Sequence, residues 1–371
     1  MHNALPDPPQ LSDLIHPPTT RRTFLARSAA AGAVLASACS PGDQGVEGGG
    51  QAADSAAIDR GSFNSNSQED TALVMEHGGS SFTPVMEGVE PAPYHDYDPT
   101  LPPLSSERTL RLNWRAQEVP LRLGPDLVVA GWTFEGDIPG PIVHVRQGDT
   151  VEFTLTNEGD MPHSMDFHSA QINPKVSFRS VPKGESVTFT FKPRYAGAFM
   201  YHCGTAPVLM HIGNGMYGAM IVSPPEPLPE AREFVLVQCE HYLAPGTAMM
   251  GFDFGKMMNT AAPDYVCFNG RPNQYVENPI RVKQGERVRF HVVSAGPQHP
   301  CAFHVVGEQF EKVYLGAPPR SFIEGVQTFS VPVGGGMTFE FVADVAGDFP
   351  FVNHGFGHGQ KGAIGFLRVE A

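Results

Sequence analysis

The stretch PIVHVRQGDTVEF at residues 141–153 returns later in the chain as PIRVKQGERVRF at residues 279–290. A second pair of segments also repeats: VTFTF followed by AGAF within residues 187–199, and MTFEF followed by AGDF within residues 337–349. In each copy apolar and polar residues alternate between Gly or Pro turns, which is typical of antiparallel strands with one buried face. The repeat therefore predicts the same kind of β domain twice.

Length and composition agree with two β domains. A chain of 371 residues is long enough for two domains and some extra, and 40 Gly with 35 Pro suit many short strands joined by turns. We predict an all-β fold of two tandem Greek-key β-sandwiches. The first spans residues 105–225 and the second residues 226–371, with the Pro-rich stretch at 224–229 as a stiff connector.

Charge and cysteine content argue against two classes of protein, nucleic-acid-binding proteins and disulfide-stabilised proteins. A net charge of −14 argues against a nucleic-acid-binding protein, which needs a basic surface. Five cysteines at wide spacings, an odd number, do not make a disulfide framework. Cys203 stands apart because it directly follows one histidine and precedes another histidine and a methionine. The cysteines in strand-like runs are interpreted as small buried hydrophobic residues: Cys239, Cys267 and Cys301.

The N-terminal segment has the pattern of an export signal. Residues 20–25 read TRRTFL, a twin-arginine pattern, and the apolar run at 29–38 is too short to cross a bilayer as a mature helix. This run ends in ASA and is followed by Cys39, so plain cleavage and a lipid-anchored cysteine both fit. We predict a signal peptide over residues 1–39, a flexible tether with some later strapping segments over residues 40–104, and a protein that works outside the cytoplasm.

A copper-binding pattern lies in the first domain. Cys203, His211 and Met216 follow the spacing Cys-x7-His-x4-Met, and His163 lies upstream. A blue copper site needs one thiolate, two imidazoles and a weak axial thioether, and these four residues supply that set. The alternative, a buried cysteine with chance neighbours, does not account for three ligand types in this order. We predict a copper site at His163, Cys203, His211 and Met216.

A second metal site follows from strand geometry. Neighbouring side chains of a strand point to opposite faces, so His202 faces away from the site that Cys203 serves. The same alternation applies upstream. His163 and His168 are five residues apart, so their side chains point to opposite faces, and Asp166, two residues before His168, shares the face of His168. We therefore expect His168 and His202 to bind a second metal, with Asp166 beside it.

The second domain has kept histidines and lost the thiolate. Asn353 falls where the repeat predicts a cysteine, His354 follows it, and His304 falls at the place of His168. A catalytic metal with an open position needs three protein ligands, by analogy with open zinc sites. The second domain is therefore expected to complete the site that begins with His168 and His202.

Four motifs carry a family resemblance. The stretches MPHSMDFH at 161–168, YHC at 201–203, HIGNGM at 211–216 and FVNH at 351–354 closely resemble those of the copper-containing nitrite reductases, and the similarity covers about residues 110–371. The resemblance implies a homotrimer of two-cupredoxin subunits with one type 1 and one type 2 copper per subunit. It also implies one-electron reduction of nitrite to nitric oxide and water.

The resemblance also implies roles for single residues. His168 and His202 of one subunit, with His354 of its neighbour, would hold the type 2 copper, and Asp166 with His304 would deliver protons. Electrons would come from a periplasmic small blue copper protein or c-type cytochrome. The chain departs from the family in a Gly-rich stretch after His354 that carries an extra histidine, interpreted as a surface residue, and in Val306 near the substrate pocket. The remaining mature-chain histidines are interpreted as structural: His77, His95, His144, His241, His291 and His299.

Two alternatives remain open on sequence alone. A laccase-type multicopper oxidase needs several His-x-His pairs, and this sequence has none. A non-enzymatic blue copper carrier needs only the four ligands of the first site. Copper counting separates them: one ion per chain indicates the carrier, two the reductase and four the oxidase.

Overall fold

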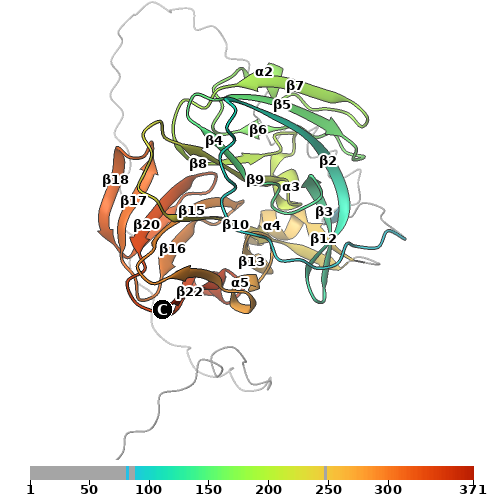
Figure 1. Cartoon of the computed structure of the whole chain (residues 1–371). Helices are drawn as coiled ribbons and strands as arrows, with labels where there is room; N and C mark the ends of the chain where they lie inside the picture. Colours follow the sequence, from blue (N-terminus) through green and yellow to red (C-terminus); the bar gives the residue numbers. More distant parts are fainter. Residues whose placement is uncertain (1–80, 83–87, 246–248) are drawn as a thin grey trace, which may run out of the picture. The chain divides into compact units, whose positions relative to one another are not determined.

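The computed structural model describes residues 81–82, 88–245 and 249–371 of the chain (Figure 1). The predicted signal peptide, with Cys39, and residues 40–80 of the predicted tether lie outside them. Within the described ranges the chain is built from β-strands and a few short helices, which confirms the all-β prediction. No helix of this part of the chain is long and apolar enough to span a membrane.

The first sandwich is formed by two sheets. The larger sheet runs in the order β1-β12-β3-β2-β5-β7, with β11 paired to β12, and the smaller in the order β4-β9-β8-β6. The strands of the larger sheet are Ser81–Phe82 (β1), Met250–Asp253 (β12), Leu127–Phe134 (β3), Thr109–Gly124 (β2), Thr150–Asn157 (β5), Ser186–Phe191 (β7) and Leu243–Pro245 (β11). Those of the smaller are Val143–Arg146 (β4), Tyr217–Ser223 (β9), Gly197–His202 (β8) and Asp166–Phe167 (β6).

The second half repeats the arrangement. One sheet runs β13-β10-β15-β20-β17-β18 and the other β14-β22-β21-β16-β19. The first comprises Tyr265–Phe268 (β13), Arg232–His241 (β10), Arg287–Gly296 (β15), Gly336–Val342 (β20), Phe310–Gly316 (β17) and Ser321–Val326 (β18). The second comprises Ile280–Lys283 (β14), Ile364–Glu370 (β22), Gly347–Asn353 (β21), Cys301–Val305 (β16) and Thr328–Val331 (β19). The helices are Pro174–Ser177 (α2), Val208–Gly213 (α3), Phe254–Thr260 (α4), Gln274–Glu277 (α5) and Phe356–Gly359 (α6).

The alternating pattern of the repeat produces the two cores. In β5, every second residue is buried, and Val151, Phe153 and Leu155 point into the first core. Phe290 of β15 and Phe303 of β16 do the same in the second core, where their rings meet edge to face with centroids 5.6 Å apart. One face of β5 is apolar and buried in this way, whereas β10 and β15 are buried along both faces.

The first sandwich also takes residues from far along the chain. Tyr242, Phe252 and Met257 are buried in its core although the repeat places them in the second domain. The benzyl ring of Phe252 fills the space beside Gly213, where an added Cβ would lie 2.3 Å from it. β12 and α4 therefore contribute side chains to the first core.

The end of the predicted tether is a strap that pairs with the second sandwich. Thr100 forms a bridge with Phe234, and the Leu101 amide donates to the carbonyl of Glu233 at 3.0 Å. The Tyr97 hydroxyl donates to the carbonyl of Gly140 at 2.7 Å. This segment is therefore hydrogen-bonded to both halves of the chain.

The two sandwiches approach each other closely at β8 and β20. Gly336 at the start of β20 has no side chain, and a Cβ there would lie 2.4 Å from the carbonyl oxygen of Ala198 in β8. This contact brings the turn before β20, which includes Gly334, against the strand that carries the predicted metal ligands.

Candidate metal centres

Three predicted ligands of the first site meet in the buried core of the first sandwich. His163 precedes β6, Cys203 directly follows β8, and His211 lies in α3. The Cys203 Sγ is 3.2 Å from the Nδ1 of His211, and that nitrogen is 3.2 Å from the Nδ1 of His163. These three ligand atoms lie within 4.8 Å of one another, and all three side chains are buried.

The fourth predicted ligand, Met216, is placed beside them by the backbone. The amide of Cys203 donates to the carbonyl of Met216 at 3.0 Å, and the amide of Met216 donates to the carbonyl of His211 at 3.2 Å. Met216 is fully buried. These two hydrogen bonds tie the strand end, the helix and the following turn into one rigid frame.

The surroundings favour a thiolate at Cys203. Burial alone would raise the pKa of this thiol, but the charge of His211 and hydrogen bonds with His163 and His211 outweigh it and hold the pKa well below its ordinary value. The amide of Ser164 donates to Sγ at 3.3 Å. The Nε2 of His211 has no hydrogen-bond partner, and the ring stacks edge-on against Trp132 at 4.8 Å between centroids. A thiolate and two imidazoles packed in this way are the donor set of a copper centre.

A second group lies on the opposite face of β8. His202, His168 and Asp166 have ligand atoms within 4.8 Å of one another. The Nε2 atoms of the two imidazoles are 3.0 Å apart, and a carboxylate oxygen of Asp166 is 3.9 Å from the His202 Nε2. Asp166 is the cross-strand partner of His202 in the pairing of β6 with β8.

The hydrogen bonds of these two imidazoles leave both Nε2 atoms facing each other. The Nδ1 of His168 is 2.9 Å from the carbonyl of Gly334, and the Nδ1 of His202 is 2.9 Å from the carbonyl of Cys203. A carbonyl only accepts, so each Nδ1 carries the hydrogen and each Nε2 presents a lone pair. Two lone pairs 3.0 Å apart repel each other unless a cation or a proton lies between them. Imidazoles held through the other nitrogen in this way are typical of metal ligands, so the residues fit a copper ion.

Electrostatics at this group favour a neutral His168. Desolvation of the ring and the neighbouring His202 lower the pKa of His168, against the opposing effect of Asp166. A neutral imidazole is the form that binds a metal. Since Cys203 and His202 are consecutive, one peptide unit joins the two groups.

His304 and His354 lie together, but apart from the other two predicted ligands. Their ring centroids are 5.4 Å apart. The Nδ1 of His304 is 2.6 Å from the carbonyl of Gln327, and His354 is exposed. Within the described part of one chain, neither joins the cluster of Asp166, His168 and His202.

The structure brings together one further pair, His299 and His358, that the sequence interpretation left unconnected. Their ring centroids are 4.8 Å apart. A signal was present in the sequence, because His299 precedes His304 by the same five residues that separate His163 from His168.

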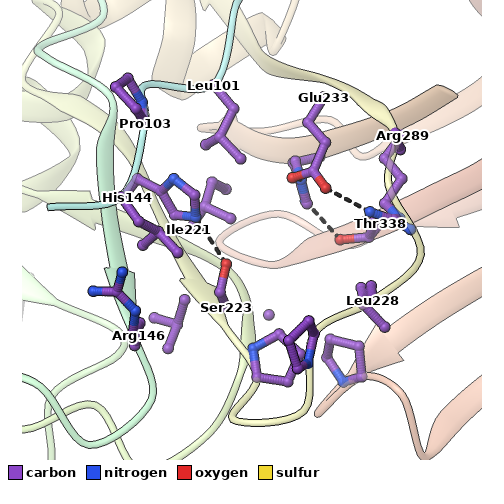
Figure 2. A pocket seen from close by; sticks show the side chains of 18 of the residues that line it. Leu101, Pro103, His144, Arg146, Ile221, Ser223, Leu228, Glu233, Arg289 and Thr338 are labelled. Atoms are coloured by element: carbon purple, nitrogen blue, oxygen red, sulfur yellow. Dashed lines mark hydrogen bonds and ion pairs between the residues drawn. The ribbon is translucent and has the colours of Figure 1, made fainter. Parts of the chain in front are cut away.

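A cavity of about 660 Å³ lies between the two sandwiches, and none of the predicted ligands lines it (Figure 2). Figure 2 shows His144 bonded to Ser223, with the two atoms 2.8 Å apart, and Glu233 paired with Arg289. These four polar side chains are thus paired with one another.

Comparison with known proteins agrees with this geometry. Residues 121–227 match a family model described as multicopper oxidase. A copper-containing nitrite reductase of Neisseria gonorrhoeae is 38% identical over 271 residues, which cover 70% of this chain and 68% of that protein. The structure of a copper nitrite reductase from Nitrosomonas europaea superposes with a TM-score of 0.65 at 34% identity, covering 70% of this chain and 94% of the other.

A solved multicopper oxidase is also similar, with a TM-score of 0.63 at 27% identity over 71% of this chain and 89% of that one. These structures confirm the prediction of two tandem cupredoxin-like sandwiches.

Proposed function

Because this chain belongs to the copper-containing nitrite reductases, we propose that it reduces nitrite to nitric oxide and water by way of two copper ions per subunit. The reaction consumes one electron and two protons for each nitrite. His163, Cys203, His211 and Met216 would hold the type 1 copper, and His168 with His202 two of the three ligand positions of the type 2 copper. When bound, the first copper supplies electron transfer and the second a Lewis-acid site for nitrite.

The observation that carries this proposal is the division of two adjacent residues between two sites. The Sγ of Cys203 faces His211 at 3.2 Å in the core, while the Nε2 of His202 faces His168 at 3.0 Å on the other side of β8. An electron that enters at the buried thiolate therefore needs to cross only one peptide unit to reach the other group. A simple electron carrier has no use for the second group.

Protons would be delivered by Asp166 and His304. The carboxylate of Asp166 lies 3.9 Å from a proposed copper ligand and is partly exposed, so it can exchange protons with water and pass them to a bound substrate. His304 would act from the second sandwich of the neighbouring subunit, because its ring lies beside that of His354, with centroids 5.4 Å apart, and neither joins the cluster within one chain. Its Nδ1 is oriented by the carbonyl of Gln327, which leaves its other nitrogen for the substrate.

The third type 2 ligand would be His354 of the neighbouring subunit in a homotrimer. Its exposure, and its distance from the cluster of His168 and His202 within one chain, support a ligand supplied between subunits. The site is then complete only in the assembled protein.

Copper counting, together with an anaerobic assay of nitric oxide formation from nitrite and a reduced artificial donor, tests the proposal. Two coppers per chain, one at the Cys203 site and one at the His202 site, and nitric oxide release are expected. His354→Ala is expected to keep the type 1 absorbance, lose one copper per chain and lose activity. A protein with a single copper, or one that does not release nitric oxide when both are loaded, would overturn the assignment.

A multicopper oxidase activity is the second candidate, favoured by the match of residues 121–227 to the multicopper oxidase model. The absence of any His-x-His pair in the sequence counts against a three-copper cluster. Four coppers per chain and oxygen consumption with a reduced donor would support it.

We further propose that the protein acts outside the cytoplasm in denitrification, exported by the twin-arginine signal of residues 1–39. It would be released by cleavage or anchored through Cys39, and would receive electrons from a small blue copper protein or a c-type cytochrome of the periplasm. Radiolabelled lipid incorporation by the wild-type chain but not by Cys39→Ala would establish anchoring, and its absence would establish cleavage.

A further inference from the structure

The second sandwich repeats the backbone frame of the Cys203 site. In the first sandwich the amide of Cys203 binds the carbonyl of Met216, whose own amide binds the carbonyl of His211. The same two hydrogen bonds recur between three residues of the second sandwich, at 3.1 and 3.2 Å. The residues in the corresponding places are Asn353 for Cys203, Ala363 for Met216 and His358 for His211. The second sandwich thus keeps one imidazole of a copper site and lacks its thiolate and thioether.

A second imidazole is supplied by His299. Its ring lies against that of His358, with centroids 4.8 Å apart, compared with 5.2 Å for the rings of His163 and His211 in the first site. Both rings are only partly buried, so solvent and small ions reach them.

The hydrogen bonds leave a lone pair on the Nδ1 of each ring. The Nε2 of His299 is 2.6 Å from the carbonyl of Ala261, so this nitrogen carries the hydrogen and Nδ1 is free to bind. The Nδ1 of His358 accepts from the side-chain amide of Asn353 at 3.2 Å. That amide nitrogen also contacts the Gln238 Oε1 at 2.5 Å and the carbonyl of Pro300 at 3.2 Å. It therefore stays hydrogen-bonded when the Nδ1 of His358 turns to another partner.

We propose that His299 and His358 form an additional site for a divalent transition-metal ion, with Cu²⁺ the ion bound most strongly. Imidazole nitrogens suit copper, zinc and nickel, and copper binds such donors most tightly in this series. Water would fill the remaining positions. With no thiolate, the ion would add no intense blue absorbance, which distinguishes it from the ion at Cys203.

The test compares the copper content of single variants. Wild-type protein, His299→Gln and His358→Gln are loaded with copper sulfate, desalted and analysed for copper per chain by mass spectrometry. Wild type loaded in this way is expected to hold three coppers per chain, the two of the proposed function and this additional ion. Each variant is expected to hold two, with the absorbance of the Cys203 site and the turnover of nitrite unchanged. His95→Gln, at a histidine with 57% of its side chain exposed, is the matched control and is expected to lose no copper.

The spectrum of the copper that the variants lose provides a second test. The difference between the electron paramagnetic resonance spectra of wild type and His358→Gln is expected to show one Cu²⁺ with nitrogen couplings. Equal copper content in wild type and both variants would overturn the site, as would a variant whose missing copper is that of the Cys203 site or the His202 site. If the proposed nitrite reduction is wrong, wild-type protein will also release no nitric oxide. If the site at His299 and His358 is wrong, only the difference in copper content between wild type and the variants disappears.

Discussion

Replacing Asp166 by Asn tests the proposed proton path with little change of shape. The Asp166 carboxylate is 3.9 Å from the Nε2 of His202, and about a third of the side chain is exposed. Asparagine fills the same volume but does not donate or accept a proton in the reaction. The change therefore removes the chemistry of this side chain and leaves the packing around β6 in place.

The expected effects on turnover and on folding differ in size. A positioned general acid contributes about 10²- to 10⁴-fold to a rate, which corresponds to roughly 3–5 kcal/mol of activation free energy. The same side chain contributes at most about 0.5 kcal/mol to folding, because its ionic contact with His202 is long and partly exposed to water. Asp166→Asn should therefore lose at least a hundredfold in turnover and keep the melting temperature of the wild-type protein.

The assay is steady-state nitric oxide production from nitrite under anaerobic conditions, with copper content and the visible absorbance of the Cys203 site measured on the same sample. Asp160→Asn is the matched control, since Asp160 is 75% exposed and pairs only with Lys183 among the contacts described. Turnover within twofold of wild type, in a variant that keeps both coppers, would remove Asp166 from the reaction.

Two further predictions concern stability. Burial raises the pKa of Glu233, but the hydrogen bond and charge of His291 and the charge of Arg289 outweigh it and lower the pKa to about 2. Because the folded-state pKa lies below that of the unfolded chain, the stabilisation is present above pH 4.5 and is lost as pH falls toward 2. Glu233→Gln should thus cost about 3 kcal/mol of unfolding free energy at pH 7 and clearly less at pH 3, as measured by urea denaturation; an equal cost at both pH values would contradict this pKa. Removing copper with a chelator should lower the melting temperature measured by calorimetry. An ion present at 100 times its dissociation constant adds about 2.7 kcal/mol to the unfolding free energy. Without it, the facing Nε2 atoms of His168 and His202 lose the cation between them. An unchanged melting temperature would show that these nitrogens hold no ion.

The alternation of side chains along each strand predicted which residues face each of the two metal sites. Alternation placed Cys203 and His202 on opposite faces, and the structure brings His211 to the first and His168 to the second. These relations depend on the two-residue period of a strand and on the cross-strand register of β6 and β8, which neighbouring residues determine.

Contacts between distant segments were not readable from the sequence. Phe252 and Met257 look like any apolar residues of the second repeat, yet they are buried in the first core because β12 pairs with β3. His299 and His358 are 59 residues apart, and only the folded second sandwich brings their rings together. Periodicity tells which side of a strand is buried, whereas the partner that buries it is settled by tertiary packing.

The carbonyl that orients His168 belongs to Gly334, a residue of the other sandwich with a positive φ of 76°. The imidazole in the first half of the polypeptide is therefore aimed only after the second half has folded and docked. A chain that lacks the turn at Gly334 would therefore keep the four residues of the Cys203 site but lose the hydrogen bond that orients His168. The two metal sites thus differ in how much of the polypeptide each one requires.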